Sequence, residues 1–117
     1  MGFDMQLPDA VDSLSALAHA SRLAVYRLLV RAGSDGMPAG EIARRIDVLP
    51  NTLSNHLTIL DRAGLVQSRR DGRSIIYSAD YDRMRDLLGF LIADCCGGRP
   101  EICAPFVGIA EEVGCCA

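Results

Sequence analysis

Residues 39–63 constrain the fold most strongly, because helix and turn signals follow one another there without a gap. A short helix is predicted over residues 39–46, a turn over residues 47–50 and a second helix over residues 51–63. On the second helix, a set of mostly apolar residues recurs at spacings of three and four and so shares one face. It consists of Leu53, His56, Leu57, Leu60 and Ala63. Two helices joined by a tight turn, the second with small polar residues outward, are typical of a helix-turn-helix that enters the DNA major groove.

A β-hairpin is predicted directly after this pair of helices. Two β-prone runs, residues 65–70 and 73–78, are joined by Asp71 and Gly72. Asp-Gly between such runs indicates a two-residue turn, because glycine adopts positive φ at little cost. The expected fold class is therefore mainly α with a β-hairpin (α+β), a winged helix-turn-helix.

Further helices flank this unit. Residues 9–32 show the periodicity of two helices, and the cluster from residue 33 to 38 reads as a turn. Asp80 is expected to cap a last helix that runs to about residue 94. Its apolar stripe consists of Met84, Leu87, Leu88, Leu91 and Ile92. No partner for that stripe is evident within the chain, so we expect a homodimer formed through the N- and C-terminal helices.

The net charge of −3 is unevenly distributed along the chain. Residues 41–78 hold six arginines and four acidic residues, whereas residues 80–117 hold three arginines and seven acidic residues. Positive charge is thus concentrated in the predicted helix-turn-helix and hairpin, where a DNA-binding protein needs it.

Two groups of side chains are candidates for contact with double-stranded DNA. On the second helix, small polar residues face away from the leucines and suit base edges or phosphates. They are Thr52, Ser54, Asn55 and Thr58. His56 lies at the edge of the apolar face, where either core packing or DNA contact is open to it. At the hairpin tip, three arginines suit phosphates or the minor groove. They are Arg69, Arg70 and Arg73.

All five cysteines fall in the last quarter of the chain: Cys95, Cys96, Cys103, Cys115 and Cys116. The acidic N-terminus does not resemble a secretory signal, and no apolar run reaches the about 18 to 20 residues of a membrane span. We therefore expect a cytoplasmic protein with no membrane contact. In a reducing cytoplasm, grouped cysteines favour soft-metal binding or redox chemistry over structural disulfides. Two parts are expected: residues 1–97 for DNA binding and dimerisation, and a cysteine-rich tail, residues 98–117.

Four motifs of the chain occur together in one known family. They are Ala18-His19-Ala20-Ser21-Arg22-Leu23, Leu53-Ser54-Asn55-His56-Leu57 with Leu60, Ala63-Gly64-Leu65-Val66, and Gly72-Arg73 with Tyr77. Over residues 10–96 the chain resembles the ArsR/SmtB-type metal-responsive repressors. The resemblance implies a homodimeric winged helix that occupies an operator without metal and leaves it when metal binds.

Two departures from the family pattern bear on function. Many relatives begin the second helix with Ser-Gln-Pro, but residues 49–52 here are Leu-Pro-Asn-Thr. The best-known arsenic sensors carry cysteines in the first helix of the helix-turn-helix, but residues 38–47 contain none. The segment 94–103 instead resembles a subgroup of arsenic repressors whose thiols follow the last helix.

The chemistry of this segment suits trivalent arsenic as an inducer ligand. As(III) is thiophilic and takes three sulfur ligands in a pyramid. Gly97, Gly98 and Pro100 interrupt any helix after the first two cysteines, so the chain can fold back and bring Cys103 towards Cys95 and Cys96. Cys115 and Cys116 are further candidate ligands, for this site or for another.

Several alternatives remain open at this stage. Antimony(III) and methylarsenite are alternative inducers, and zinc is a rival because four thiolates suit it tetrahedrally. The cysteines also suit a redox switch on a winged-helix repressor. A metalloid-buffering or partner-docking module is a further reading. An enzyme is not expected, since the sequence shows no nucleophile–base pair and no cofactor loop.

Overall fold

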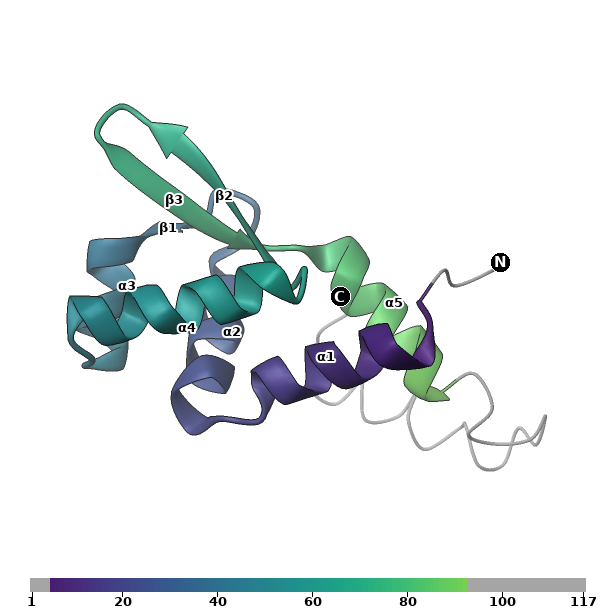
Figure 1. The fold of residues 1–117 in the computed structure, drawn as a ribbon. Coiled ribbons are helices and arrows are strands. Elements are labelled where there is room, and N and C mark those ends of the chain that lie inside the picture. The colour runs from purple at the N-terminus through teal and green to yellow at the C-terminus, as the bar shows by residue number, and fades with distance from the viewer. Residues whose placement is uncertain (1–4, 93–117) are drawn as a thin grey trace.

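In a computed structural model of the 117-residue chain, residues 5–92 are described. These residues form five helices and a small sheet (Figure 1). The helices are α1 (Leu7–Leu17), α2 (Ala20–Ala32), α3 (Ala39–Ile46), α4 (Pro50–Arg62) and α5 (Tyr81–Ile92). The strands are β1 (Met37–Pro38), β2 (Val66–Asp71) and β3 (Ser74–Ala79). The predicted winged helix-turn-helix, mainly α with a β-hairpin, is confirmed.

Local side-chain bonds set several helix boundaries. The backbone N–H of Gln6, just before α1, donates to the carboxylate of Asp9 over 3.2 Å. His19 caps the start of α2, because its Nδ1 accepts the Ser21 N–H over 3.1 Å. Asp80 caps α5 as predicted, with its Oδ1 accepting the Arg83 N–H over 3.1 Å. Such caps satisfy N–H groups that have no partner within the helix.

The main core lies between α2, the helix-turn-helix pair and the sheet. Its largest fully buried side chains come from α2, α3, α4 and the segment after α4. They include Val25, Leu29, Ile42, Leu53, Leu57, Leu60 and Leu65. Each fully buried leucine or isoleucine contributes about 1.5–3 kcal/mol relative to exposure, so this cluster fixes the orientation of α4. Among residues 5–92, no helix has the length and apolarity that crossing a membrane requires.

The sheet differs from the prediction in two details. A third strand, β1, lies where a turn was predicted, and it pairs antiparallel with β3, Met37 opposite Tyr77. The hairpin turn is also one residue later than predicted. Asp71 still pairs with Ser74, so Gly72 and Arg73 form the turn, with Gly72 at φ +63°.

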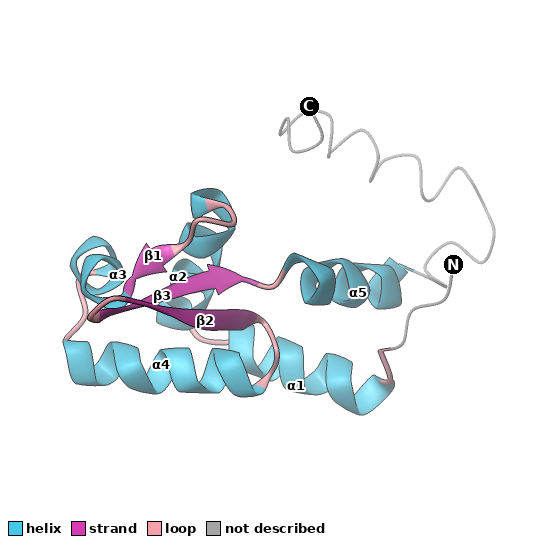
Figure 2. Cartoon of the chain, turned by 90° about the horizontal axis from the view of Figure 1, so that it is seen from above, coloured by secondary structure: helices cyan, strands magenta, loops and turns pink. Residues whose placement is uncertain are grey.

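The last helix also differs from the prediction, because it has a partner within the chain. Leu87 of α5 is buried with Met5 and Ala10, and Leu17 and Phe90 pack against them. Figure 2 shows α1 and α5 together at one end of the molecule, with α3 at the other end. The stripe of α5 is only partly used by this contact, since Leu88, Leu91 and Ile92 stay exposed.

Candidate nucleic-acid interface

Helix α4 presents a polar outer face and a buried apolar face. Thr52, Ser54, Asn55 and Thr58 are all exposed, as the sequence predicts. The Thr58 hydroxyl donates to the Ser54 carbonyl over 2.9 Å, which leaves its oxygen lone pairs free to accept. Because Leu53, Leu57 and Leu60 are almost fully buried on the opposite side, the helix cannot rotate about its axis. The polar side chains are therefore held in a fixed orientation towards solvent.

His56 lies with the buried face and not with the exposed one. Its side chain is 7% exposed, and its ring centroid lies 4.8 Å from that of His19. Burial lowers the pKa of His56, and the nearby His19 and Arg22 lower it further. Of the two roles that the sequence left open for His56, its placement favours packing.

The three arginines of the hairpin are exposed but not equivalent. Arg69 stands opposite Ile76 and Arg70 opposite Ile75, so their side chains project from opposite faces of the hairpin. The Arg69 Nη2 donates to the Asp35 carbonyl over 3.0 Å. Arg73 lies in the turn itself. Figure 1 shows the hairpin projecting from the body of helices, which gives it the shape of a wing.

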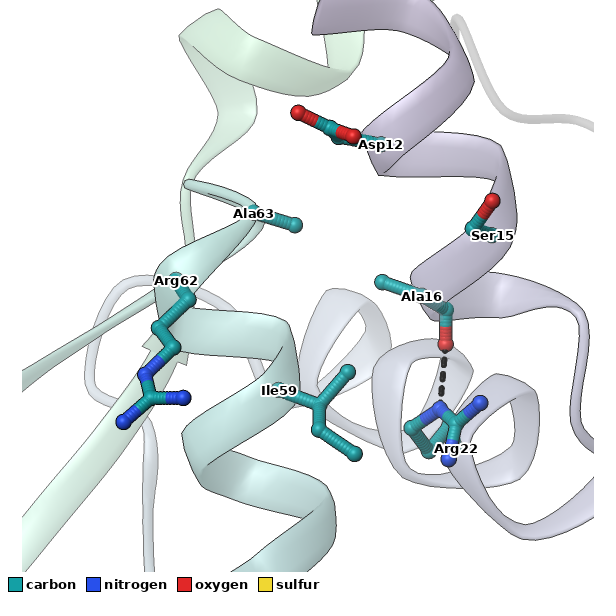
Figure 3. A pocket seen from close by; sticks show the side chains of 7 residues that line it. All are labelled: Asp12, Ser15, Ala16, Arg22, Ile59, Arg62 and Ala63. Carbon is teal, nitrogen blue, oxygen red and sulfur yellow. Dashed lines mark hydrogen bonds between the residues drawn. The ribbon is translucent and has the colours of Figure 1, made fainter.

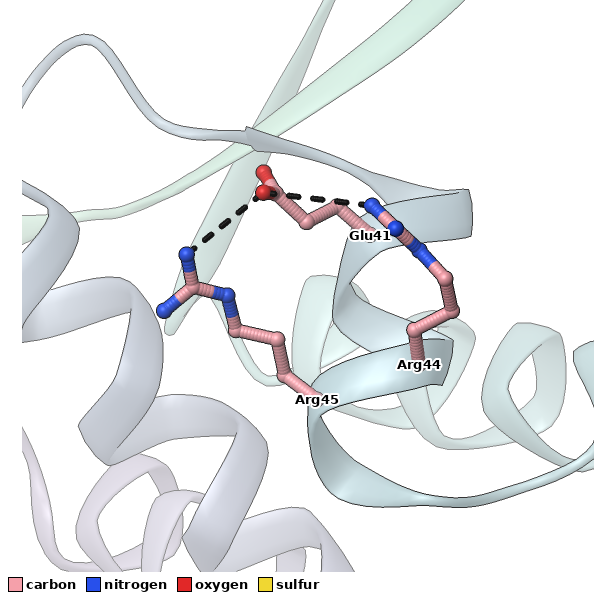
Figure 4. Close-up of polar contacts among 3 residues, drawn as sticks. All are labelled: Glu41, Arg44 and Arg45. Atoms are coloured by element: carbon pink, nitrogen blue, oxygen red, sulfur yellow. Dashed lines mark ion pairs between the residues drawn. The ribbon is translucent and has the colours of Figure 1, made fainter.

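Sequence reasoning overlooked some polar residues of the helix-turn-helix. Asn51 in the first turn of α4 is exposed. On α3, the Glu41 carboxylate contacts the guanidinium groups of Arg44 and Arg45 over 3.9 and 3.5 Å (Figure 4). Helical spacing of three and four residues from Glu41 was the available signal. Exposed pairs of this kind contribute little to stability, and Arg45 also lines a cleft with Arg31 of α2 and Met37.

A cleft of about 240 Å³ separates the helix-turn-helix from the wing. Its walls are mostly apolar, and they include Ala43 of α3, Pro50 and Leu53 of α4, and Ile75 and Tyr77 of β3. The wing and the first turn of α4 therefore lie on either side of one groove.

A second cleft, of about 370 Å³, lies between α1, α2 and α4 (Figure 3). In its wall the Arg22 Nε donates to the Ala16 carbonyl over 2.6 Å. This bond ties α2 to the end of α1, which is a structural role for Arg22. Ile59 and Arg62 of α4 form the opposite wall.

The predicted metalloid ligands, Cys95, Cys96, Cys103, Cys115 and Cys116, lie outside the described residues. Within residues 5–92 no cluster of three or more potential metal-binding side chains occurs. The two histidines of that part contact each other.

Comparison with known proteins gives sequence matches over the same region. A family model described as a helix-turn-helix domain matches residues 17–69. The nodulation protein NolR of Rhizobium meliloti is 35% identical over 82 residues, which are 70% of this chain and 65% of NolR, slightly under two thirds of its length. The HTH-type transcriptional regulator YgaV of Escherichia coli is 32% identical over 78 residues, 67% of this chain and 77% of YgaV.

Solved structures match the fold over a similar extent. A homodimeric winged helix-turn-helix DNA-binding domain from Mycobacterium bovis, described as a possible ArsR-family regulator, is 29% identical, covers 75% of this chain and 81% of that domain, and has a TM-score of 0.62. A possible transcriptional regulator for arsenical resistance is 28% identical over 70% of this chain and 82% of that one, also with a TM-score of 0.62.

Proposed function

Because the chain belongs to the ArsR family of winged-helix transcriptional regulators, we propose that it is a repressor whose operator complex dissociates when trivalent arsenic binds its C-terminal cysteines. YgaV is described as a transcriptional regulator and the Mycobacterium bovis domain as a DNA-binding domain, and this chain is likewise not an enzyme. We propose a cytoplasmic location, where thiols stay reduced.

One observation carries the DNA-binding part of the proposal: the outward row of small polar side chains on a helix fixed by its buried leucines. Asn55 and Ser54 carry the donors and acceptors that read base edges, and Thr52 and Thr58 flank them. Arg69, Arg70 and Arg73 on the wing add cationic contacts to phosphate. We leave His56 out of the proposed surface, because it is buried against His19.

Dimerisation would cover the apolar faces that α1 and α5 leave exposed. On α1 these side chains are Leu7, Val11 and Leu14. On α5 they are Leu88, Leu91 and Ile92. Apolar side chains gathered on two adjacent helices mark a protein interface, and a two-fold dimer would bury the same patch on both subunits. That the domain from Mycobacterium bovis is homodimeric supports dimerisation.

The sensing part of the proposal follows from the chemistry of the cysteines. Cys95 and Cys96 follow α5 closely in the sequence, and Cys103 follows after Gly97, Gly98 and Pro100. Three thiolates match the pyramidal coordination of As(III), and antimonite would bind in the same way. The tail, residues 98–117, would then supply Cys103 and, in a wider site, Cys115 and Cys116. The structural neighbour described as a possible regulator for arsenical resistance supports arsenic over zinc.

Release requires that arsenic bind one dimer geometry better than the other. The proposed site adjoins α5, and α5 carries half of the proposed dimer surface. A ligand there would alter how the two subunits meet, and thereby the spacing of the two α4 helices. Two recognition helices fit one operator only when they are spaced about one helical turn of DNA apart.

Footprinting on the DNA upstream of the genes that the protein regulates, with and without arsenite, tests the proposal. We expect the wild-type footprint to vanish with arsenite, and the footprints of Cys95→Ser and Cys96→Ser to persist. Unchanged release in both variants would overturn the site assignment. Release by peroxide but not by arsenite would identify a redox switch instead.

A further inference from the structure

Leu49 is an exposed apolar side chain that lies outside the proposed dimer surface on α1 and α5. The exposed apolar side chains of α1 and α5 lie at the end of the molecule where these two helices meet (Figure 2). Leu49 precedes α4, and at 74% it is the most exposed large apolar side chain among residues 5–92. Its neighbour Val48 packs against the core, whereas Leu49 does not.

The backbone places Leu49 just beyond the start of the recognition helix. It is the N-cap of α4, with φ −67° and ψ 147°, so its side chain does not join the leucine face of the helix. The next residue, Pro50, lines the groove between the helix-turn-helix and the wing, and Ile75 lies on the wing side of that groove. In helix-turn-helix proteins the first residues of this helix reach the base edges.

Leucine at this position lowers the stability of the helix. An N-cap is usually Ser, Thr, Asp or Asn, whose oxygen accepts an N–H bond from the first turn. Leu49 has no such oxygen, and α4 has no side-chain cap. Leu49 is therefore unfavourable in two ways: it does not cap the helix, and its apolar side chain is exposed to water. A contact made only in the complex with DNA would account for both.

On this basis we propose that Leu49 contacts the C5-methyl group of a thymine in each half-site, and so determines a preference for thymine there. The inference rests on the proposed DNA-binding surface. The major groove presents few apolar groups, and the thymine methyl is the one that distinguishes a base. An exposed leucine beside polar residues that read base edges has no other apolar partner on DNA bases.

The test uses a duplex selected by the wild-type protein from random-sequence DNA. Each thymine of a half-site is replaced in turn by deoxyuridine, which lacks only the methyl group, and affinity is measured by fluorescence anisotropy. At one thymine per half-site, wild-type affinity should fall about fourfold, the factor that burial of one methyl group supplies. Leu49→Ala should bind the thymine duplex more weakly and should not respond to deoxyuridine.

Two further variants separate DNA contact from a structural role. Ile59→Ala removes an exposed apolar side chain of α4 that faces the cleft beside α1, and it should keep the response to deoxyuridine. Leu49→Ser restores an N-cap, so it should raise the melting temperature while abolishing the thymine preference.

If the wild-type protein binds the thymine and deoxyuridine duplexes equally at every position, the proposed role of Leu49 is wrong, but the proposed DNA binding still stands. The same holds if a Leu49→Ala variant shows the wild-type response. Failure to select any duplex would overturn the proposed DNA binding, and this inference with it.

Discussion

The imidazole rings of His19 and His56 lie against each other, with centroids 4.8 Å apart and planes tilted by 48°. His19 caps α2 through its Nδ1, and His56 lies on the buried face of α4. The contact therefore links the first turn of α2 to the recognition helix. The buried Nδ1 of His56 has no hydrogen-bond partner within residues 5–92, so the neutral ring is held by packing.

This contact predicts that acid destabilises the fold. Burial, His19 and Arg22 lower the pKa of His56 in the folded state, while the unfolded chain keeps the ordinary pKa of about 6.5. The unfolded state therefore binds more protons as the pH falls, so stability is full above about pH 6.5 and declines below it. The melting temperature should fall between about pH 7.5 and pH 5.5. It should fall less in His56→Gln, and parallel curves for the two proteins would refute this explanation.

Gly36 predicts a large loss of stability on substitution. Its φ is +73°, and a Cβ would collide with the carbonyl oxygen of Tyr77 on β3. Gly36→Ala should lower the free energy of unfolding by about 2 kcal/mol or more in urea titrations. Gly40→Ala is the matched control, because its Cβ would meet open space on helix α3. That variant should be neutral or more stable by about 0.5–1 kcal/mol, and equal losses at the two positions would contradict the geometry.

We expect substitution of Arg22 to lower the stability of the fold, and substitution of Arg62 in the same cleft to have little effect. The partly buried Nε of Arg22 bonds to the Ala16 carbonyl over 2.6 Å. Arg22→Met should lower the free energy of unfolding by about 1.5–3 kcal/mol, since the Ala16 carbonyl on a buried residue loses its hydrogen bond from a charged donor. Arg62→Met, exposed in the same cleft, should change it by less than about 0.5 kcal/mol. Chemical denaturation of both variants checks the difference, which should vanish if Arg22 has no structural role.

Substitution of the wing arginines should change the salt dependence of DNA affinity more than the sequence preference. Arg70→Ala and Arg73→Ala should each weaken binding to all duplexes and reduce the slope of log affinity against log salt by about 1. Arg85→Ala on α5 should leave the slope unchanged, because α5 lies at the opposite end of the molecule from the wing tip (Figure 1). Titrations at several salt concentrations measure the slopes, and identical slopes in all variants would exclude a phosphate role for the wing.

The elements that the sequence predicted are those whose signals are local. The leucine spacing of α4 and the Asp71-Gly72 pair lie within the elements they define, and both elements are present. Strand β1 was missed because two residues, one of them a proline, show no alternation. It exists only through its pairing with β3, about forty residues later in the sequence.

The same distinction applies to the candidate site. The exposed residues of α4 followed from periodicity, but the role of His56 depended on His19, which the sequence places far away. The partner of Leu87 on α1 was also missed, because an apolar stripe looks the same whichever surface covers it.

The central claim is that the outer face of α4 binds duplex DNA, and the affinity of Asn55→Ala tests it most directly. Anisotropy on the selected duplex should give binding at least about fivefold weaker than wild type, since a good base contact contributes about 1–3 kcal/mol. Ser15→Ala, an exposed polar position on α1, should bind within about twofold of wild type. Wild-type affinity in a folded Asn55→Ala protein would contradict the assignment of this face to DNA.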